Sequence, residues 1–142
     1  LVSAEGRFKA WDVNAHDLMY TSDLRGSEFF FGVADYDGQS VVRIVFFSDT
    51  PYKKGYWRQF STMELGIGGD YENGWNLSDA EFSNAAFSEM AVEAVFNMPE
   101  SFVPAAKKGS TLHLKMTDYD GDVIHAIFSL SGFTAAHNNI IK

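Results

Sequence analysis

The segment from Pro51 to Arg58 has the residue types and spacing best suited to binding chemistry. It holds three of the chain's eleven Lys and Arg residues, interleaved with aromatic residues, in a chain with a net charge of −8. Aromatic rings stack on sugar rings and cations, and basic groups attract anionic partners. We therefore predict a ligand- or partner-binding surface made of Tyr52, Lys53, Lys54, Tyr56, Trp57 and Arg58. The alternative is a turn with solvated lysines and with aromatic rings that belong to the core.

Two of the four histidines, His113 and His125, are candidates for metal ligation. In the hairpin register argued below, both lie on the polar face of one hairpin. A zinc site needs at least a third protein ligand. The nearby Asp118 and Asp122 are confined to the turn, so the simpler interpretation is two strand histidines, and we predict no metal site.

An acidic turn, Asp118-Tyr119-Asp120-Gly121-Asp122, is similar to the start of a calcium-binding loop. An EF-hand loop that begins at Asp118 requires Gly at its sixth position and Glu at its twelfth. Val123 and Ser129 stand there instead. We therefore interpret the segment as an ordinary hairpin turn.

Residues for covalent catalysis are not arranged in any recognisable pattern. The chain has no Cys, which removes thiolate nucleophiles, disulfides and cysteine-based zinc sites. It also has no Gly-x-Ser-x-Gly motif, which is typical of a nucleophilic serine. We predict no catalytic residue, no cofactor and no enzymatic activity. An enzyme whose titratable groups converge in a pocket is the less favoured alternative.

The elements that must position these residues begin with a motif that occurs twice, Asp-Tyr-Asp-Gly, at residues 35–38 and 118–121. Asp and Gly tolerate positive φ, so each motif predicts a hairpin turn. A two-residue turn at Asp37-Gly38 places apolar residues opposite one another on one face: Phe29 with Phe46, Phe31 with Ile44, and Val33 with Val42. The other face is mixed and carries Glu28, Phe30, Gly32, Val41 and Arg43.

The second hairpin separates apolar from polar residues best with a three-residue loop, Tyr119-Asp120-Gly121. The apolar face then pairs Met116 with Ile124, Leu114 with Ala126, and Leu112 with Phe128. A slip of one residue would exchange the two faces, so the hydrophobic pattern specifies this register.

Further strands are predicted at residues 7–13, 57–67 and 71–77. Residues 88–96 fit a strand, which we favour, or a helix that begins at Ser78 with Glu81 in a capping box. Short helices are predicted within residues 99–108, before Gly109, and at residues 135–140 after a Thr134 cap. Many short strands with Gly-rich turns predict a mainly β fold, an antiparallel β-sandwich or flattened barrel formed by residues 1–142 as a single domain.

Composition limits the classes of partner. A hydrophobic fraction of 46% and an aromatic fraction of 15% supply a core. The net charge of −8 repels phosphate backbones, so we expect no nucleic-acid partner. No apolar run approaches the roughly 20 residues of a membrane span. The sequence does not specify an oligomeric state.

Two segments near the C-terminus form a specific pattern: residues 105–112, Ala-Ala-Lys-Lys-Gly-Ser-Thr-Leu, and residues 128–136, Phe-Ser-Leu-Ser-Gly-Phe-Thr-Ala-Ala. The pattern resembles the invasion-associated locus B family, whose members end in a helix, a Lys-Gly-Ser turn, a hairpin and a Ser-Leu-x-Gly-Phe-Thr-Ala-Ala segment before a terminal helix. Residues 51–55 and 67–70 look like that family's mid-chain turns.

The resemblance implies a small β-sandwich in the periplasm, or in the exported fraction, of a Gram-negative cell. Small residues in Val2-Ser3-Ala4 suit a signal-peptidase site, in agreement with a removed leader. The family has no agreed enzymatic activity, so no catalytic residue is carried over. We expect a periplasmic or secreted, non-enzymatic protein that binds a protein or cell-envelope partner, with a role related to invasion or host interaction. The alternative is a carbohydrate- or small-ligand-binding module that uses surface aromatics.

Overall fold

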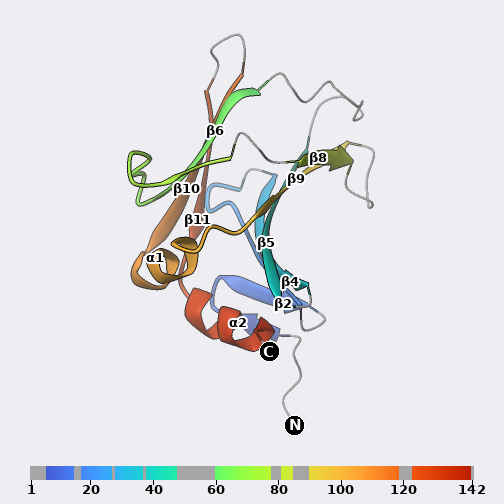
Figure 1. The fold of residues 1–142 in the computed structure, drawn as a ribbon, viewed down its shortest axis with the longest axis vertical. Helices are drawn as coiled ribbons and strands as arrows, with labels where there is room; N and C mark the ends of the chain where they lie inside the picture. Colours follow the sequence, from blue (N-terminus) through green and yellow to red (C-terminus); the bar gives the residue numbers. More distant parts are fainter. Residues whose placement is uncertain are drawn as a thin grey trace.

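The fold consists of two antiparallel β-sheets packed against each other, with two short helices at one end (Figure 1). This computed structural model describes residues 6–14, 17–26, 28–36, 38–47, 60–77, 81–84, 90–118 and 123–141. The predicted antiparallel sandwich is confirmed, and the strands in these ranges form two separate sheets rather than a barrel.

The large sheet has seven strands in the order β1-β2-β3-β4-β5-β9-β8. Its first five strands follow one another along the chain, so each pairs with the next through a short connection. The strands are β1 (Gly6–Phe8), β2 (Trp11–Asn14), β3 (Leu18–Ser22), β4 (Phe29–Tyr36), β5 (Gln39–Phe47), β9 (Ala91–Asn97) and β8 (Glu81–Asn84).

The small sheet has four strands in the order β11-β10-β6-β7. Its strands come from the middle and the end of the chain, which therefore crosses between the sheets more than once. They are β11 (Val123–Ser129), β10 (Thr111–Asp118), β6 (Phe60–Ile67) and β7 (Trp75–Asn76).

Both predicted hairpin registers are confirmed. In the β4–β5 hairpin, Phe31 lies opposite Ile44, as the two-residue turn requires. In the β10–β11 hairpin, Leu114 lies opposite Ala126. Residues 119–122, which include the predicted three-residue loop, lie outside the described residues. In each hairpin the apolar face packs between the sheets, apart from Ile124, which is exposed, so the hydrophobic pattern did specify the pairing.

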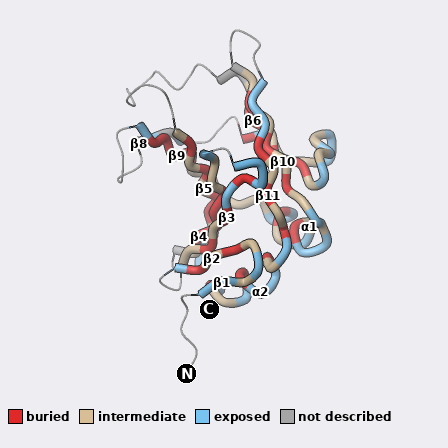
Figure 2. The backbone as a smooth tube through the Cα atoms, turned by 180° about the vertical axis from the view of Figure 1, so that it is seen from behind, coloured by how far each residue is buried: buried red, intermediate tan, exposed pale blue. Residues whose placement is uncertain are grey.

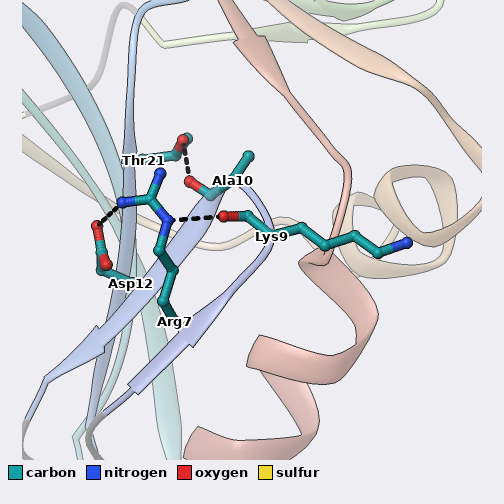
Figure 3. A network of polar contacts seen from close by, with 5 residues as sticks. All are labelled: Arg7, Lys9, Ala10, Asp12 and Thr21. Carbon is teal, nitrogen blue, oxygen red and sulfur yellow. Dashed lines mark hydrogen bonds and ion pairs between the residues drawn. The ribbon is translucent and has the colours of Figure 1, made fainter.

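The predicted single strand at residues 7–13 is wrong, because the chain reverses within it to form the β1–β2 hairpin. Lys9 takes a positive φ of 55° at the turn. Figure 3 shows how polar contacts fix the turn: the Arg7 Nε donates to the Lys9 carbonyl at 2.9 Å, and the Thr21 hydroxyl donates to the Ala10 carbonyl at 2.7 Å. The turn is therefore held by Arg7 of its own hairpin and by Thr21 of the neighbouring strand β3.

Two strands were predicted in the middle of the chain, and residues 57–59 of the first lie outside the described residues. The strand expected at residues 57–67 is described from Phe60 onward as β6. The strand expected at residues 71–77 is reduced to β7, because residues 71–74 form a turn in which the Gly74 amide donates to the Tyr71 carbonyl at 3.2 Å.

The ambiguous segment at residues 88–96 is a strand over residues 91–97, β9, and pairs with β5 along its whole length. The prediction of a strand is therefore confirmed. The sequence analysis missed two strands of the same sheet, β3 and β8. Both are short, and pairing with a longer neighbour stabilises each of them.

The two helices, α1 (Phe102–Lys108) and α2 (Phe133–Ile140), lie at the same end of the sandwich (Figure 1). The prediction for α1 is confirmed, and Gly109 follows its last residue. The predicted Thr134 cap is wrong, because α2 begins earlier and its N-cap is Gly132. No helix in the described parts of the chain is long and apolar enough to cross a membrane.

The core lies between the sheets and is closed at one end by the helices (Figure 2). Aromatic rings from both sheets and both helices meet there. The Phe31 ring lies 5.6 Å from Phe128 and 5.7 Å from Phe102, and the Trp11 ring lies 5.3 Å from Phe133. All five side chains have at most 1% of their surface exposed, so a single aromatic cluster joins the two layers.

One edge of the small sheet is covered by the turn after β3. The buried Asp23 carboxylate accepts the Ile127 amide of β11 at 2.6 Å, and the Leu24 amide donates to the Ile127 carbonyl at 2.7 Å. The Arg25 guanidinium donates to the His125 carbonyl. These contacts satisfy outward-facing main-chain groups of an edge strand and fasten the two sheets together.

Candidate binding groove

The outward face of the large sheet carries an apolar groove of about 440 Å³. Side chains alternate between the two faces of a strand, so the residues between the core residues of β2–β5 and β9 all point outward. The groove is lined by Asn14, Leu18, Tyr20, Phe30, Gly32, Arg43, Val45, Phe47 and Glu93. The five strands that supply these residues are adjacent in the sheet, and β9 is distant from the others in the sequence.

The walls of the groove are aromatic and aliphatic. The rings of Phe30 and Phe47 meet edge to face, with their centroids 6.5 Å apart. Val45 lies directly opposite Phe30 in the β4–β5 register, and Tyr20 stands on the neighbouring strand β3. These side chains are only half-buried, so apolar surface is open to a ligand.

The floor of the groove is Gly32, which pairs with Tyr20 on one side and Arg43 on the other. A Cβ atom at this position would lie 3.3 Å from the Leu18 Cδ1 and 3.3 Å from the Met19 carbonyl oxygen. The missing side chain is what leaves a hollow among larger neighbours. A bulkier residue would fill it.

A charged pair closes one side of the groove. The Arg43 Nε donates to the Glu93 carboxylate at 2.8 Å, and its Nη2 makes a second contact with the same oxygen. The two side chains are 29% and 14% exposed, respectively. Arg43 belongs to β5 and Glu93 to the neighbouring strand β9, so the pair also fixes those strands side by side. Because each charge is neutralised by the other, the groove has little net charge.

The binding surface predicted from sequence lies elsewhere in the chain. Its six residues, Tyr52, Lys53, Lys54, Tyr56, Trp57 and Arg58, all fall within residues 48–59, outside the described residues. That surface therefore stays a prediction. The groove residues Phe30, Gly32 and Arg43 were recognised only as the mixed face of a hairpin. The alternation of Leu18 and Tyr20 with the buried Met19 and Thr21 was the available signal for the rest.

The three histidines in the described residues lie apart from the groove. His113 and His125 point to the outer face of the small sheet, as the register predicted, and His137 is buried in α2. The His113 Nε2 lies 3.2 Å from the Thr111 hydroxyl. Burial, and then the charges of Arg25 and His125, lower the pKa of His113. Within the described ranges, no three His, Cys, Asp or Glu side chains are grouped so that they could hold a metal ion.

Comparison with solved structures shows the same fold in the crystal structure of invasion associated protein B from Bartonella henselae. The TM-score is 0.69, and the match covers 97% of this chain and 96% of that chain at 13% sequence identity. No protein-family model matches the sequence, and no curated protein matches it. The resemblance noted at the C-terminus is thus supported at the level of the fold, over nearly the whole length of both chains.

Proposed function

We propose that this chain is an exported, non-enzymatic protein that binds a protein partner by taking an apolar side chain of that partner into the groove of the large sheet. The observation that carries the proposal is a half-exposed groove with apolar walls on the outside of an otherwise well-packed sandwich. The likeness to an invasion associated protein supports a related role in host interaction, and the resemblance of the sequence supports export.

Apolar surface left in contact with water is the physical basis for this binding. Burying one large apolar side chain contributes roughly 1.5–3 kcal/mol. The groove volume of about 440 Å³ accommodates an aromatic side chain and part of the segment that carries it. Binding of this kind places one anchor residue in a pocket, which is how many protein interfaces gain most of their affinity.

The chemistry of the walls favours a protein side chain over a sugar. A sugar ring needs several polar groups for its hydroxyls, whereas the two charged groups here, Arg43 and Glu93, bind each other. A binding site for a carbohydrate or other small ligand is the second candidate. It is favoured by the aromatic rings of Tyr20, Phe30 and Phe47, which offer stacking surfaces.

The test is a titration of the protein with N-acetyl-phenylalaninamide and, separately, with methyl β-glucoside, followed by NMR. We expect saturable binding of the first compound with a dissociation constant of roughly 1 mM, and no binding of the second. The variant Val45→Gln places a polar group in the groove wall and should weaken binding about fivefold or more.

The matched control is Val123→Gln, the same change at an exposed position of β11. It should leave the affinity unchanged. If the glucoside binds and the phenylalanine compound does not, the second candidate replaces the first. Equal loss in both variants would contradict a role for the groove, and so would a hydrolytic or transfer activity that a single substitution abolishes.

A further inference from the structure

The outer face of the small sheet gathers basic residues in a chain whose net charge is −8. Lys115 occupies the centre of this face, with Glu64 of β6 opposite it on one side and His125 of β11 on the other. His113 lies two residues before Lys115 in β10 and therefore points to the same face. Side chains directly opposite one another in paired strands have Cβ atoms about 5 Å apart, so these groups form one cluster.

Two turns bring further side chains to the cluster. Arg25, from the turn after β3, donates to the His125 carbonyl, and its side chain is 53% exposed. Tyr71, from the turn before β7, lies beneath Lys115, with the Lys115 Nζ 5.6 Å from the centre of its ring. Burial and then the Arg25 charge lower the pKa of His113, whereas the Arg25 charge opposes the rise in the pKa of Tyr71 that burial and Glu64 cause, so the guanidinium acts on both groups.

The positive charges of the cluster are only partly neutralised. Within the described residues, Lys115 makes no ion pair and Arg25 makes one, a 4.0 Å contact with Asp23. The Asp23 carboxylate also accepts the Ile127 amide. Glu64 is the carboxylate opposite Lys115, and burial and then the charge of Glu64 raise the pKa of Tyr71. Arg25 and Lys115, with His113 and His125 beside them, therefore present donors that an anion would satisfy.

We propose that this face of the small sheet binds a single tetrahedral oxyanion, a phosphate or sulfate group, between Arg25, Lys115 and His113. Guanidinium groups match the oxygen spacing of such anions, and a lysine adds a mobile charge. The negative charge of the whole protein opposes long polyanions such as nucleic acids, so the site selects a compact group. The site is separate from the groove of the large sheet and does not depend on it.

Proton uptake is coupled to this binding. Burial, and then the charges of Arg25 and His125, lower the pKa of His113, and Lys115 lies two residues further along β10 on the same face. The Thr111 hydroxyl also contacts its ring, and a Cβ atom at Gly69 would lie 3.7 Å from the His113 Nδ1. A bound oxyanion offsets the repulsion from these cations and raises the pKa of His113. By linkage, an oxyanion whose own charge is constant, such as sulfate, binds more tightly as the pH falls from 8 to 6.

The experiment follows the imidazole NMR signals of His113 during titration with sodium phosphate or sodium sulfate at constant ionic strength. Glucose 6-phosphate and glucose 6-sulfate form a second arm, which distinguishes a free oxyanion from one carried by a sugar. Binding in either arm supports the proposal, and the tighter arm identifies the source. We expect saturation and at least tenfold weaker binding in Lys115→Gln and Arg25→Gln. With sulfate, whose charge is constant in this range, we also expect tighter binding at pH 6 than at pH 8.

Lys9→Gln is the matched control, since it removes the same charge from an exposed position at the edge of the large sheet. It should leave the affinity unchanged. Arg25 also supports the β11 edge, so Lys115→Gln is the deciding variant if Arg25→Gln unfolds. If the His113 signals shift without saturation and equally in all variants, the anions only screen the surface charges, and the proposal is overturned. Equal affinity for acetate would overturn the assignment to a tetrahedral group.

Discussion

Within the segment of residues 128–136, the backbone at position 132 requires glycine. Its φ is +89°, and a Cβ atom there would lie 1.9 Å from the Phe8 carbonyl oxygen. Neighbouring residues of the segment also pack against the core. The Trp11 indole donates to the Ser129 carbonyl at 2.9 Å, and the Phe133 ring packs on Trp11. The pattern that carries the family resemblance is therefore a packing motif. It predicts the fold well and carries no information about chemistry.

A substitution at Gly132 tests whether the left-handed backbone and the close approach to Phe8 require glycine. Gly132→Ala should lower the free energy of unfolding by between about 2 and 6 kcal/mol, because backbone strain and the clash with Phe8 each cost about 1–3 kcal/mol. Gly26→Ala is the matched control, since Gly26 has a φ of +79° and open space around it. Urea denaturation should show a smaller loss for Gly26→Ala, about 1–2 kcal/mol. Equal losses would contradict the close approach to Phe8.

His137 makes the stability depend on pH. Its ring stacks on Phe133, and its Nδ1 is buried without a hydrogen-bond partner among the described residues. Burial, and then the charge of Lys107, lower its pKa, while Asp35 acts in the opposite direction. The unfolded chain therefore binds a proton more readily than the native protein does. Stability should be full above pH about 6.5 and should fall as the pH decreases through and below this value.

Thermal unfolding between pH 8 and pH 5 measures this effect. His137→Phe keeps an aromatic ring against Phe133 and should flatten the pH dependence. The pKa of His113 is also lowered, so the comparison should be made in a His113→Gln background. An unchanged pH profile after His137→Phe would contradict the account.

At the scale of elements, the alternation of apolar and polar residues determined which strands could be predicted from the sequence. The β4–β5 and β10–β11 hairpins have long strands with one apolar face, and both registers followed from the sequence. The strands β3 and β8 were missed because they have only five and four residues, too few to show a period of two clearly. The turn at Lys9 and the start of α2 depend on contacts with distant residues, Thr21 and Phe8, which no local pattern reveals.

The contacts that cover the edge of β11 can also be tested by mutation. Asp23→Ala leaves the partly buried Ile127 amide without its acceptor and should cost about 1–3 kcal/mol of unfolding free energy. Asp23→Asn keeps an acceptor oxygen at the same place and should cost less. Urea denaturation checks both values, and sedimentation shows whether the exposed edge promotes association. Identical stability of the two variants would contradict the role given to the hydrogen bond.

On the scale of the whole molecule, the sandwich presents two unlike outer faces. The large sheet carries the apolar groove, and the small sheet carries the basic cluster around Lys115. Neither site was found from sequence, because each is assembled from strands and turns that only the fold brings together. Phe30 and Arg43, for example, were already on one hairpin face, but Leu18 and Glu93 complete the groove from β3 and β9. The prediction at Tyr52–Arg58 rests on local composition alone.

The most direct measurement for the central claim is a map of where an apolar ligand binds. Amide NMR spectra of the protein should be recorded with and without N-acetyl-phenylalaninamide. The account predicts that the largest shifts fall on the groove strands, at Tyr20, Phe30, Val45 and Phe47, with little change at the small-sheet residues His113 and Lys115. Shifts centred on the small sheet, or none at saturating ligand, would contradict a binding groove on the large sheet.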